Sequence, residues 1–398
     1  MNVSPVELAP GVHWVGVPHP DLKRFDIIME VGHGTTYNAY LVKGERCVLI
    51  DTVKGRFSDE LLDKLESQID PASLSAIVVQ HTEPDHAGAL EALLERAPDA
   101  EVICARAAVK FVKGTLNRDA AIRPVADNDT LDLGGATLRF FATPFLHWPD
   151  TMMTWLDEHQ ILFSCDVFGA HYCDTRLFDD LIGEPSWPEF EYYYRRIMRP
   201  FGKNVRSALK KIAPLPIRMI APSHGPVYRS GPRRALQAYQ TWSSAAEPNE
   251  PPRVLIFYAS AHGNTRRMAE EIAAGISSKK ADVQLFDAEV LDPEDYLDAI
   301  EAADAVLFGS PTINNDAVKP VWDVINSTAT LAVKGKVAGS FGSYGWSGEA
   351  IPFLDARLSA LKFRLPCEGL SAVLVPGETE LKSCFEFGIK IASAVRES

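Results

Sequence analysis

Residues 81–86, HTEPDH, place four potential metal ligands in six positions: His81, Glu83, Asp85 and His86. The apolar run AIVVQ (76–80) precedes them, and GALEALLERA (88–97), which has helical periodicity, follows. The ligands therefore lie at the end of a predicted strand and the start of a helix. An ordinary loop rarely concentrates two imidazoles and two carboxylates in this way, and the pattern predicts a metal site.

Three later predicted strands also end in a potential ligand. LRFFATPFLH ends at His147, ILFSCD at Asp166 and IRMIAPSH at His224. A lone histidine is more often structural than a ligand, but independent structural roles would not place ligand types at successive strand ends. Seven ligands fit two ions, each with two histidines and a terminal carboxylate, and Asp166 suits the bridging position. Imidazole with several carboxylates favours iron, whereas structural zinc prefers cysteine and histidine.

The chain is long enough for two domains, with 398 residues and 46% hydrophobic residues. The polar, proline-rich stretch SSAAEPNEPP (243–252) predicts a linker between a first domain, residues 1–246, and a second, residues 253–398. A net charge of −13 argues against broad binding of nucleic acid or anionic membranes. No signal peptide or membrane helix is recognisable, so we expect a cytoplasmic protein.

The six cysteines are scattered and form no CxxC pair. We therefore expect free thiols in a reducing compartment and no rubredoxin-like or thioredoxin-like module on this chain.

The two predicted domains have different strand patterns. In the second, five short apolar runs alternate with helical segments, which predicts a doubly wound parallel sheet. In the first, many strands accompany fewer helices, including a long helical pattern over residues 189–212. That mixture suggests two sheets packed between helices, an αβ/βα sandwich.

Three loops of the second domain fall where such sheets bind ligands, beyond the carboxyl ends of the strands. The first resembles a phosphate cradle at a helix N-terminus but lacks the lysine of a nucleotide-triphosphate loop, so a flavin mononucleotide (FMN) fits it best. The other two are placed to flank the flavin ring, with Trp346 and Tyr344 as stacking candidates; local packing is the alternative for Trp346. The predicted FMN contacts are Ser260, His262, Gly263, Asn264, Thr265, Pro311, Thr312, Ile313, Asn314, Asn315, Ser343, Tyr344, Gly345 and Trp346.

The order HxExDH, His, Asp, His resembles the metallo-β-lactamase-like domain of the flavodiiron proteins, or A-type flavoproteins. The hydrolytic branch of that superfamily usually reads HxHxDH and binds zinc, whereas this chain carries Glu83 at the second position. GTTYNAYLV (34–42), HWPDTM (147–152) and SCDVFG (164–169) agree with the resemblance, which covers essentially the whole chain. It implies a metallo-β-lactamase-like αβ/βα sandwich followed by a flavodoxin-like sheet.

The resemblance also implies a ligand set. His81, Glu83 and His147 would bind one iron, and Asp85, His86 and His224 the other, with Asp166 between them. Trp148 and Tyr194 resemble aromatic residues that line the family's substrate pocket, and His171 follows the Asp166 loop. Core packing remains the alternative for these three residues.

Together, FMN and a di-iron site would form a path from an external donor to a gas. The expected activity is reduction of O2 to water, of NO to N2O, or of both, with electrons from rubredoxin or another small electron-transfer protein. The resemblance implies a head-to-tail homodimer, or a dimer of such dimers. Two rivals remain: a di-zinc hydrolase fused to a flavodoxin domain, and a non-enzymatic redox protein with a vestigial metal site.

Overall fold

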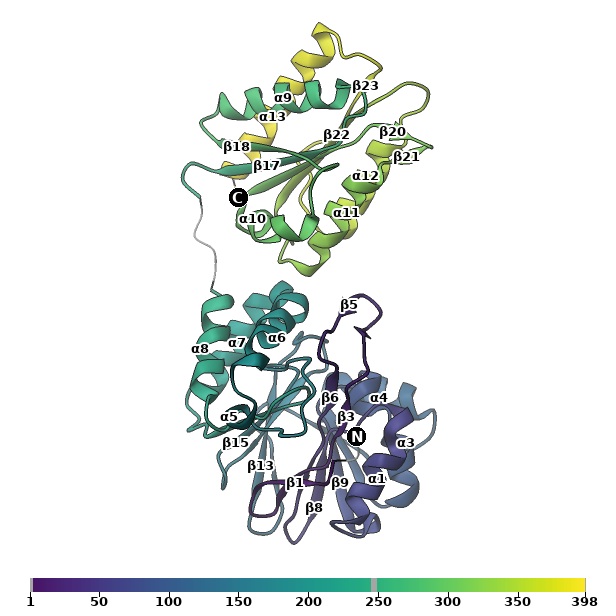
Figure 1. The fold of residues 1–398 in the computed structure, drawn as a ribbon, viewed down its shortest axis with the longest axis vertical. Helices are drawn as coiled ribbons and strands as arrows, with labels where there is room; N and C mark the ends of the chain where they lie inside the picture. The colour runs from purple at the N-terminus through teal and green to yellow at the C-terminus, as the bar shows by residue number, and fades with distance from the viewer. Residues whose placement is uncertain (1–2, 245–248, 398) are drawn as a thin grey trace. The chain divides into compact units, whose positions relative to one another are not determined.

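The computed structural model describes residues 3–244 and 249–397 and divides the chain into two compact units, Met1–Ser244 and Ala245–Ser398 (Figure 1). Part of the predicted linker, residues 245–248, lies outside the described residues. Each unit has its own hydrophobic core, and that of the second is split by its sheet into two clusters.

The N-terminal unit contains a seven-stranded sheet and a five-stranded sheet. The first has the order β1-β2-β7-β8-β9-β10-β11, with parallel pairing from β8 to β11. Its strands are β1 (Val6–Ala9), β2 (Val12–Trp14), β7 (Tyr40–Val42), β8 (Cys47–Ile50), β9 (Leu74–Val79), β10 (Glu101–Ala105) and β11 (Ile122–Val125). The second sheet contains, in this spatial order, β12 (Thr130–Asp132), β13 (Thr137–Ala142), β14 (Met152–Leu156), β15 (Ile161–Cys165) and β16 (Met219–Pro222).

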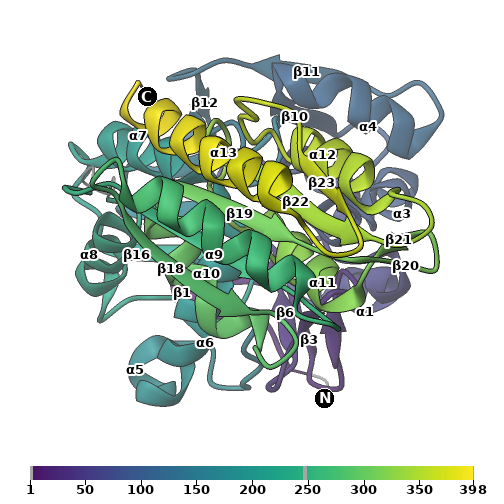
Figure 2. The same ribbon diagram turned by 90° about the horizontal axis from the view of Figure 1, so that it is seen from above.

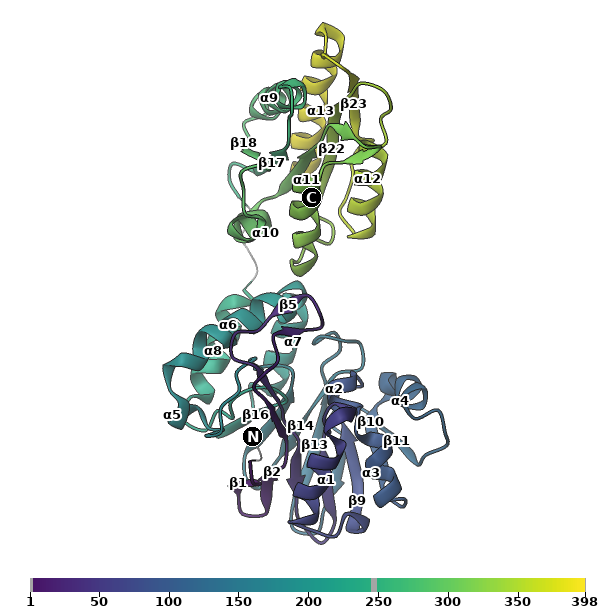
Figure 3. The ribbon, with the colours of Figure 1, turned by 45° about the vertical axis from the view of Figure 1, so that its right-hand side comes forward.

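Helices cover the outer faces of both sheets, which confirms the expected αβ/βα sandwich (Figure 3). On the side of the seven-stranded sheet lie α1 (Ser58–Glu66), α3 (Leu90–Arg96) and α4 (Val109–Leu116). On the side of the five-stranded sheet lie α6 (Trp187–Tyr193), α7 (Gly202–Ile212) and α8 (Pro232–Trp242), with the short α5 (Asp179–Ile182) beside them.

The helical pattern expected over residues 189–212 forms, but it is not one continuous α-helix. After α6 the chain forms a π-helical turn, Tyr194–Met198, and a 3-10 turn, Arg199–Phe201, before α7 begins. Pro200 cannot donate a backbone hydrogen bond, so an uninterrupted α-helix is disfavoured there. The π-helical turn rotates the side chains that follow α6 relative to an ideal helix.

The C-terminal unit is the expected doubly wound sheet, with the order β18-β17-β19-β22-β23 and parallel pairing throughout. The strands are β17 (Arg253–Tyr258), β18 (Asp282–Asp287), β19 (Ala305–Gly309), β22 (Val337–Tyr344) and β23 (Leu370–Val373). Because strand side chains alternate between faces, Leu255 and Phe257 pack in one core cluster while Val254 and Ile256 pack in the other. The helices on the first face are α10 (Leu297–Ala302), α11 (Lys319–Ser327) and α12 (Ala350–Ala360).

On the other face α9 (Asn264–Ser277) and α13 (Glu378–Arg396) lie side by side (Figure 2). Two glycines let their backbones approach closely. A Cβ atom on Gly275 would lie 2.1 Å from the carbonyl oxygen of Phe385, and one on Gly388 would lie 2.2 Å from that of Ile272. Any other residue at either position would push the helices apart.

Candidate di-iron and flavin sites

The seven predicted ligands come together in the N-terminal unit, at the carboxyl ends of β9, β13, β15 and β16 and in the short helix α2 (Pro84–Ala87). Asp166 follows β15 and lies at the centre. Its Oδ2 is 3.8 Å from Nε2 of His81 and 3.7 Å from Nε2 of His147. Its Oδ1 is 3.2 Å from Nε2 of His86 and 3.4 Å from Nε2 of His224. Each carboxylate oxygen therefore faces a different pair of imidazoles.

Glu83 completes the first group. Its Oε2 lies 3.1 Å from Nε2 of His81 and 3.1 Å from Nε2 of His147. The ligand atoms of these three residues lie within 4.8 Å of one another, close enough to reach one ion after small movements.

Asp85 completes the second group. Its Oδ1 is 3.8 Å from Nε2 of His86, and its Oδ2 is 3.4 Å from Nε2 of His224. Neither oxygen of this buried carboxylate has a hydrogen-bond partner among the described residues. A buried carboxylate without such a partner is costly, and a metal ion between these ligands would satisfy it. The donor set of the two groups, imidazole and carboxylate only, fits a pair of iron ions.

Two carboxylates that sequence analysis missed orient the histidines from behind. Asp150 Oδ2 lies 3.4 Å from Nδ1 of His81 and accepts hydrogen bonds from the backbone and hydroxyl of Thr82, at 2.9 and 2.6 Å. Asp51 Oδ2 lies 3.3 Å from Nδ1 of His86. Such partners fix the tautomer of a ligating histidine, so that Nε2 is free to bind metal. The sequence does contain a signal for each. In HWPD, Asp150 closely follows the ligand His147, and in LID, Asp51 directly follows an apolar strand.

Mutual electrostatic stabilisation decides the charges in this cluster. Burial opposes the charged form of His81, but hydrogen bonds with Asp150 and Glu83 outweigh it and raise its pKa to about 9. Burial likewise opposes a charged Glu83, yet hydrogen bonds from His147 and His81 hold its pKa well below the usual range. A metal ion that binds here must displace the proton held on His81.

Of the three residues predicted to surround the site, His171 and Trp148 lie against it. The His171 ring centroid is 5.4 Å from that of His224, and its Nδ1 lies 2.9 Å from the hydroxyl of Thr35. Burial and the neighbouring charge of His224 lower the pKa of His171 well below its ordinary value, so its imidazole is neutral. The Trp148 ring meets His81 edge-on, with centroids 5.0 Å apart.

Tyr194 is placed elsewhere, and its neighbour Tyr193 contacts the cluster. The Tyr193 hydroxyl donates to Oδ1 of Asp166 across 3.1 Å. The Tyr194 ring packs against Tyr239 and Trp242, with centroids 4.9 and 5.1 Å away. Consecutive helical side chains point about 100° apart, so only one of the two can face the metal ligands.

The C-terminal unit has a pocket of about 240 Å³ where the three predicted loops meet. Ten of the predicted FMN contacts line it, together with Ala261 and Leu374, which sequence analysis missed. Gly263 caps α9 in the left-handed region, at φ 80°, and turns the chain into the helix. Thr265 and Ser343 join two of the loops through their hydroxyls, 3.0 Å apart. The start of a helix beside hydroxyls provides a phosphate cradle.

Four of the predicted contacts do not line this pocket: Gly263, Asn314, Asn315 and Trp346. Asn314 and Asn315 have φ values of 55° and 62° and form the tight turn between β20 (Thr312–Ile313) and β21 (Asp316–Ala317). The Trp346 side chain is 89% exposed. The backbone requirement of the hairpin accounts for the two asparagines.

Comparison with known proteins identifies a family for each of the two units. A family model described as ODP family beta lactamase matches residues 35–225, and a flavodoxin model matches residues 256–388. The type A flavoprotein fprA of Rhodobacter capsulatus is 44% identical over 98% of this chain and 91% of its own length. The chain belongs to the flavodiiron proteins, the A-type flavoproteins.

Other members of the flavodiiron family carry enzymatic names. A nitric oxide reductase of Moorella thermoacetica is 37% identical, covering 99% of this chain and 100% of the relative. The crystallised rubredoxin oxygen:oxidoreductase of Desulfovibrio gigas is 30% identical, with a TM-score of 0.72 and 99% coverage of each chain. This flavodiiron protein is therefore an oxidoreductase with FMN and a di-iron centre as its cofactors, and the hydrolase interpretation is not favoured.

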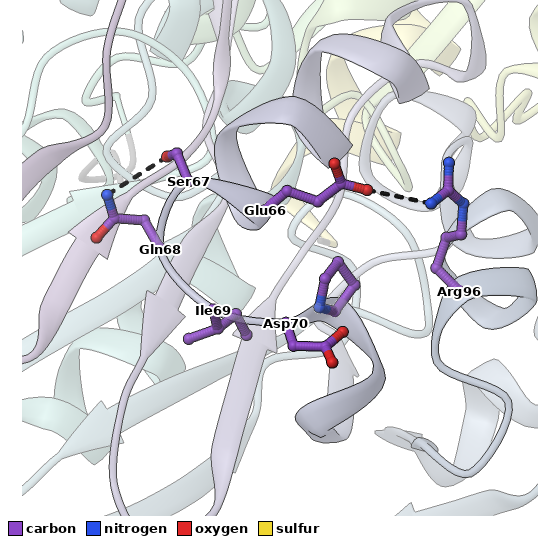
Figure 4. Close-up of a pocket in the computed structure, with 7 residues that line it drawn as sticks. Glu66, Ser67, Gln68, Ile69, Asp70 and Arg96 are labelled. Atoms are coloured by element: carbon purple, nitrogen blue, oxygen red, sulfur yellow. Dashed lines mark hydrogen bonds and ion pairs between the residues drawn. The ribbon is translucent and has the colours of Figure 1, made fainter.

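Two further observations concern the rest of this flavodiiron protein. A polar surface hollow of about 530 Å³ lies at the end of α1, where Glu66 and Arg96 form an ion pair at 3.1 Å (Figure 4). None of the predicted site residues lines it. Among the described residues, no helix is both long and apolar enough to cross a membrane.

Proposed function

We propose that this chain reduces O2 to water, NO to N2O, or both, at two irons held by the seven ligands, with electrons that FMN receives from an external protein. One observation carries the proposal: the two oxygens of Asp166 face different histidine pairs. A carboxylate in that position can bridge two ions, whereas a single-ion site has no use for the second group of ligands.

The residues around the cluster have separate tasks. His81, Glu83 and His147 would hold the first ion, and Asp85, His86 and His224 would hold the second. When bound, iron and FMN supply gas binding and electron transfer: four electrons and four protons convert O2 to two waters, and two of each convert two NO to N2O and water. Asp51 and Asp150 keep the Nε2 atoms of two ligands directed at the ions.

The gas substrates also need room beside the ions. Trp148 and the neutral His171 border the cluster, and the Tyr193 hydroxyl stays protonated because burial and the charge of Asp166 raise its pKa well above the ordinary value. These groups present an aromatic surface and a hydrogen-bond donor next to the bridging carboxylate. Small apolar gases are suited to such surroundings, whereas an ester or amide substrate would need more polar groups.

The test begins with protein purified from iron-supplemented cells. We expect two irons and one FMN per chain, and reoxidation of the anaerobically reduced protein by O2, NO or both. The ratio of the two rates identifies the preferred gas. Two zinc ions, with a flavin inert to both gases, would contradict the proposal and restore the hydrolase. Reduction by rubredoxin, compared with that by a flavodoxin or a ferredoxin, then tests the proposed donor.

We propose further that the protein works as a head-to-tail homodimer, alone or as a dimer of dimers, in which FMN of one chain serves the metal centre of its partner. The proposal is supported by the location of the two sites in separate compact units. The cytoplasmic location expected from the sequence also stays a prediction.

Complementation tests the arrangement. Asp166→Ala removes the bridging ligand, and Ser260→Asp places a negative charge in the phosphate loop. A co-expressed heterodimer of these variants keeps one intact pairing if electrons cross between chains, so we expect activity although each variant alone is inactive. An inactive heterodimer with normal assembly would contradict the proposal.

A further inference from the structure

A second group of potential ligands lies behind His86, on the side away from the cluster. Nδ1 of His86 is 3.3 Å from Oδ2 of Asp51 and 3.9 Å from Sγ of Cys165. All three side chains are buried, and their ligand atoms lie within 4.8 Å of one another. Only His86 belongs to the seven proposed iron ligands, and it faces the iron cluster through its other nitrogen.

These distances match those of a tetrahedral zinc site. With bonds of about 2.0–2.1 Å to nitrogen and oxygen and about 2.3 Å to sulfur, tetrahedral angles separate nitrogen from oxygen by about 3.3 Å and nitrogen from sulfur by about 3.6 Å. The observed separations at His86 are 3.3 and 3.9 Å. A movement of a few tenths of an ångström at Cys165 would bring its sulfur to the tetrahedral separation from Nδ1 of His86.

Oδ2 of Asp51 also accepts hydrogen bonds from the hydroxyl of Ser223, at 3.0 Å, and from Gln80, which could supply a fourth ligand. Nε2 of Gln80 donates to this oxygen across 3.2 Å, and the buried Oε1 of Gln80 has no hydrogen-bond partner among the described residues. A half-turn of the amide places the oxygen where the nitrogen now lies. Thiolate, imidazole and carboxylate or amide oxygen then form a donor set that favours zinc or cobalt, because a soft sulfur ligand replaces one hard carboxylate.

We propose that Asp51, Cys165, Gln80 and Nδ1 of His86 form a zinc- or cobalt-binding site that excludes the second iron. On binding, the metal displaces the thiol proton, which leaves to solvent, and the proton on Nδ1 of His86 moves to Nε2. The Nε2 hydrogen then points at Oδ1 of Asp166, 3.2 Å away, and this nitrogen can no longer bind iron. The exclusion of the second iron rests on the proposed function, in which His86 binds iron. The metal–sulfur bond to Cys165 is independent of that function.

X-ray absorption at the zinc edge tests the metal–sulfur bond directly. The full chain is expressed in zinc-supplemented, iron-limited medium, so that the buried site can load as the protein folds. We expect one sulfur neighbour at about 2.3 Å from zinc. None of the seven iron ligands is a cysteine, so zinc in the iron positions would give nitrogen and oxygen neighbours only. A wild-type spectrum without sulfur would overturn the proposal.

Variants identify which sulfur is bound. Cys165→Ser and Cys165→Ala should both lose the sulfur neighbour, and agreement between them guards against a folding defect in either. Cys104→Ser is the matched control, because Cys104 is also buried at the end of a strand in this unit but belongs to no candidate ligand group. A sulfur signal that survives in both Cys165 variants would sink the assignment.

Iron loading tests the exclusion. Both proteins are grown with zinc and treated with the same mild chelator. Wild-type protein that keeps its sulfur-bound zinc should then take up one iron per chain, whereas Cys165→Ser should take up two. Uptake of two irons by wild-type protein that keeps its zinc–sulfur bond would overturn the exclusion and leave the zinc site standing. Failure of zinc-free wild-type protein to bind two irons would instead contradict the proposed function.

Discussion

The hydroxyl of Tyr193 donates a hydrogen bond to Oδ1 of Asp166 across 3.1 Å. The same oxygen faces the imidazoles of His86 and His224. One neutral hydroxyl donor and two histidine ligands therefore surround a single carboxylate oxygen. Burial keeps the phenol protonated, because it raises the pKa of Tyr193 well above the ordinary value. The hydrogen bond therefore restrains the carboxylate in the orientation that separates the two histidine pairs.

Replacing Tyr193 by phenylalanine removes that restraint. Hydrogen bonds to charged groups contribute about 1.5–3 kcal/mol, so we expect the calorimetric transition of the N-terminal unit to fall by several degrees. The second iron should also dissociate faster. Tyr192→Phe is the control, because that ring lies under the guanidinium of Arg196 and not against the cluster. Equal behaviour of the two variants would show that the Asp166 contact contributes nothing.

The paired carboxylates behind the histidines allow the two ions to be weakened separately. Asp51→Asn disturbs His86, and Asp150→Asn disturbs His81, while the iron ligands themselves stay in place. Loss of such a partner typically lowers metal affinity about 10–100-fold. We expect each variant to retain one iron under chelator competition and to lose the other, which spectroscopy of the iron centre would distinguish. Loss of both irons in either variant would contradict separate control.

Metal affinity should increase with pH. Between its ordinary pKa, near 6.5, and the raised value of about 9, His81 carries a proton that the ion must displace. Glu83 stays ionised throughout this range because its pKa is lowered, so it adds no dependence. Each displaced proton changes the apparent affinity about tenfold per pH unit. Competition with a chelator of known proton affinity, from pH 6.5 to 8.5, measures the slope, and a flat profile would be inconsistent with a protonated His81.

Gly263 allows a test of the phosphate loop. Its φ of 80° is unfavourable for alanine, although a Cβ there would meet nothing within 4 Å. We expect Gly263→Ala to lower FMN affinity, because strain of about 1–2 kcal/mol would move the loop. Gly335→Ala is the matched control: it has φ 85° and equal space, and it precedes the start of β22, whereas the pocket lies at that strand's other end. Titration of flavin fluorescence should then show weaker binding in the first variant only.

The metal ligands could be predicted because they share a simple rule: each follows an apolar strand or lies in the adjacent helical turn. Strands of both sheets bring such positions to one edge of the sandwich. Tyr193 was not predicted because the sequence does not show which side of this helix faces the core. The π-helical turn that follows makes it harder still to say which of the three consecutive tyrosines points inward. Asp51 and Asp150 were missed because a carboxylate behind a ligand has no fixed sequence spacing from it.

In the flavin domain, the loops could be located from the strand pattern, but the individual contacts depend on backbone conformation. Asn314 and Asn315 satisfy a hairpin turn that requires positive φ, and Leu374 reaches the pocket from a strand end whose alignment with the other loops follows only from the folded sheet. Polar residue types indicate a binding loop. They do not say which side chains are used to build the loop itself.

The glycine contacts between α9 and α13 link the far end of the chain to cofactor binding. The first turn of α9 lies in the flavin pocket, while Gly388 sits on a helix whose residues do not line it. With backbone pressed on backbone, no flexible side chain can absorb an added methyl group. Replacing Gly388 by a larger residue would therefore displace α9. A substitution in the C-terminal helix can thus weaken FMN binding although no residue of that helix lines the pocket.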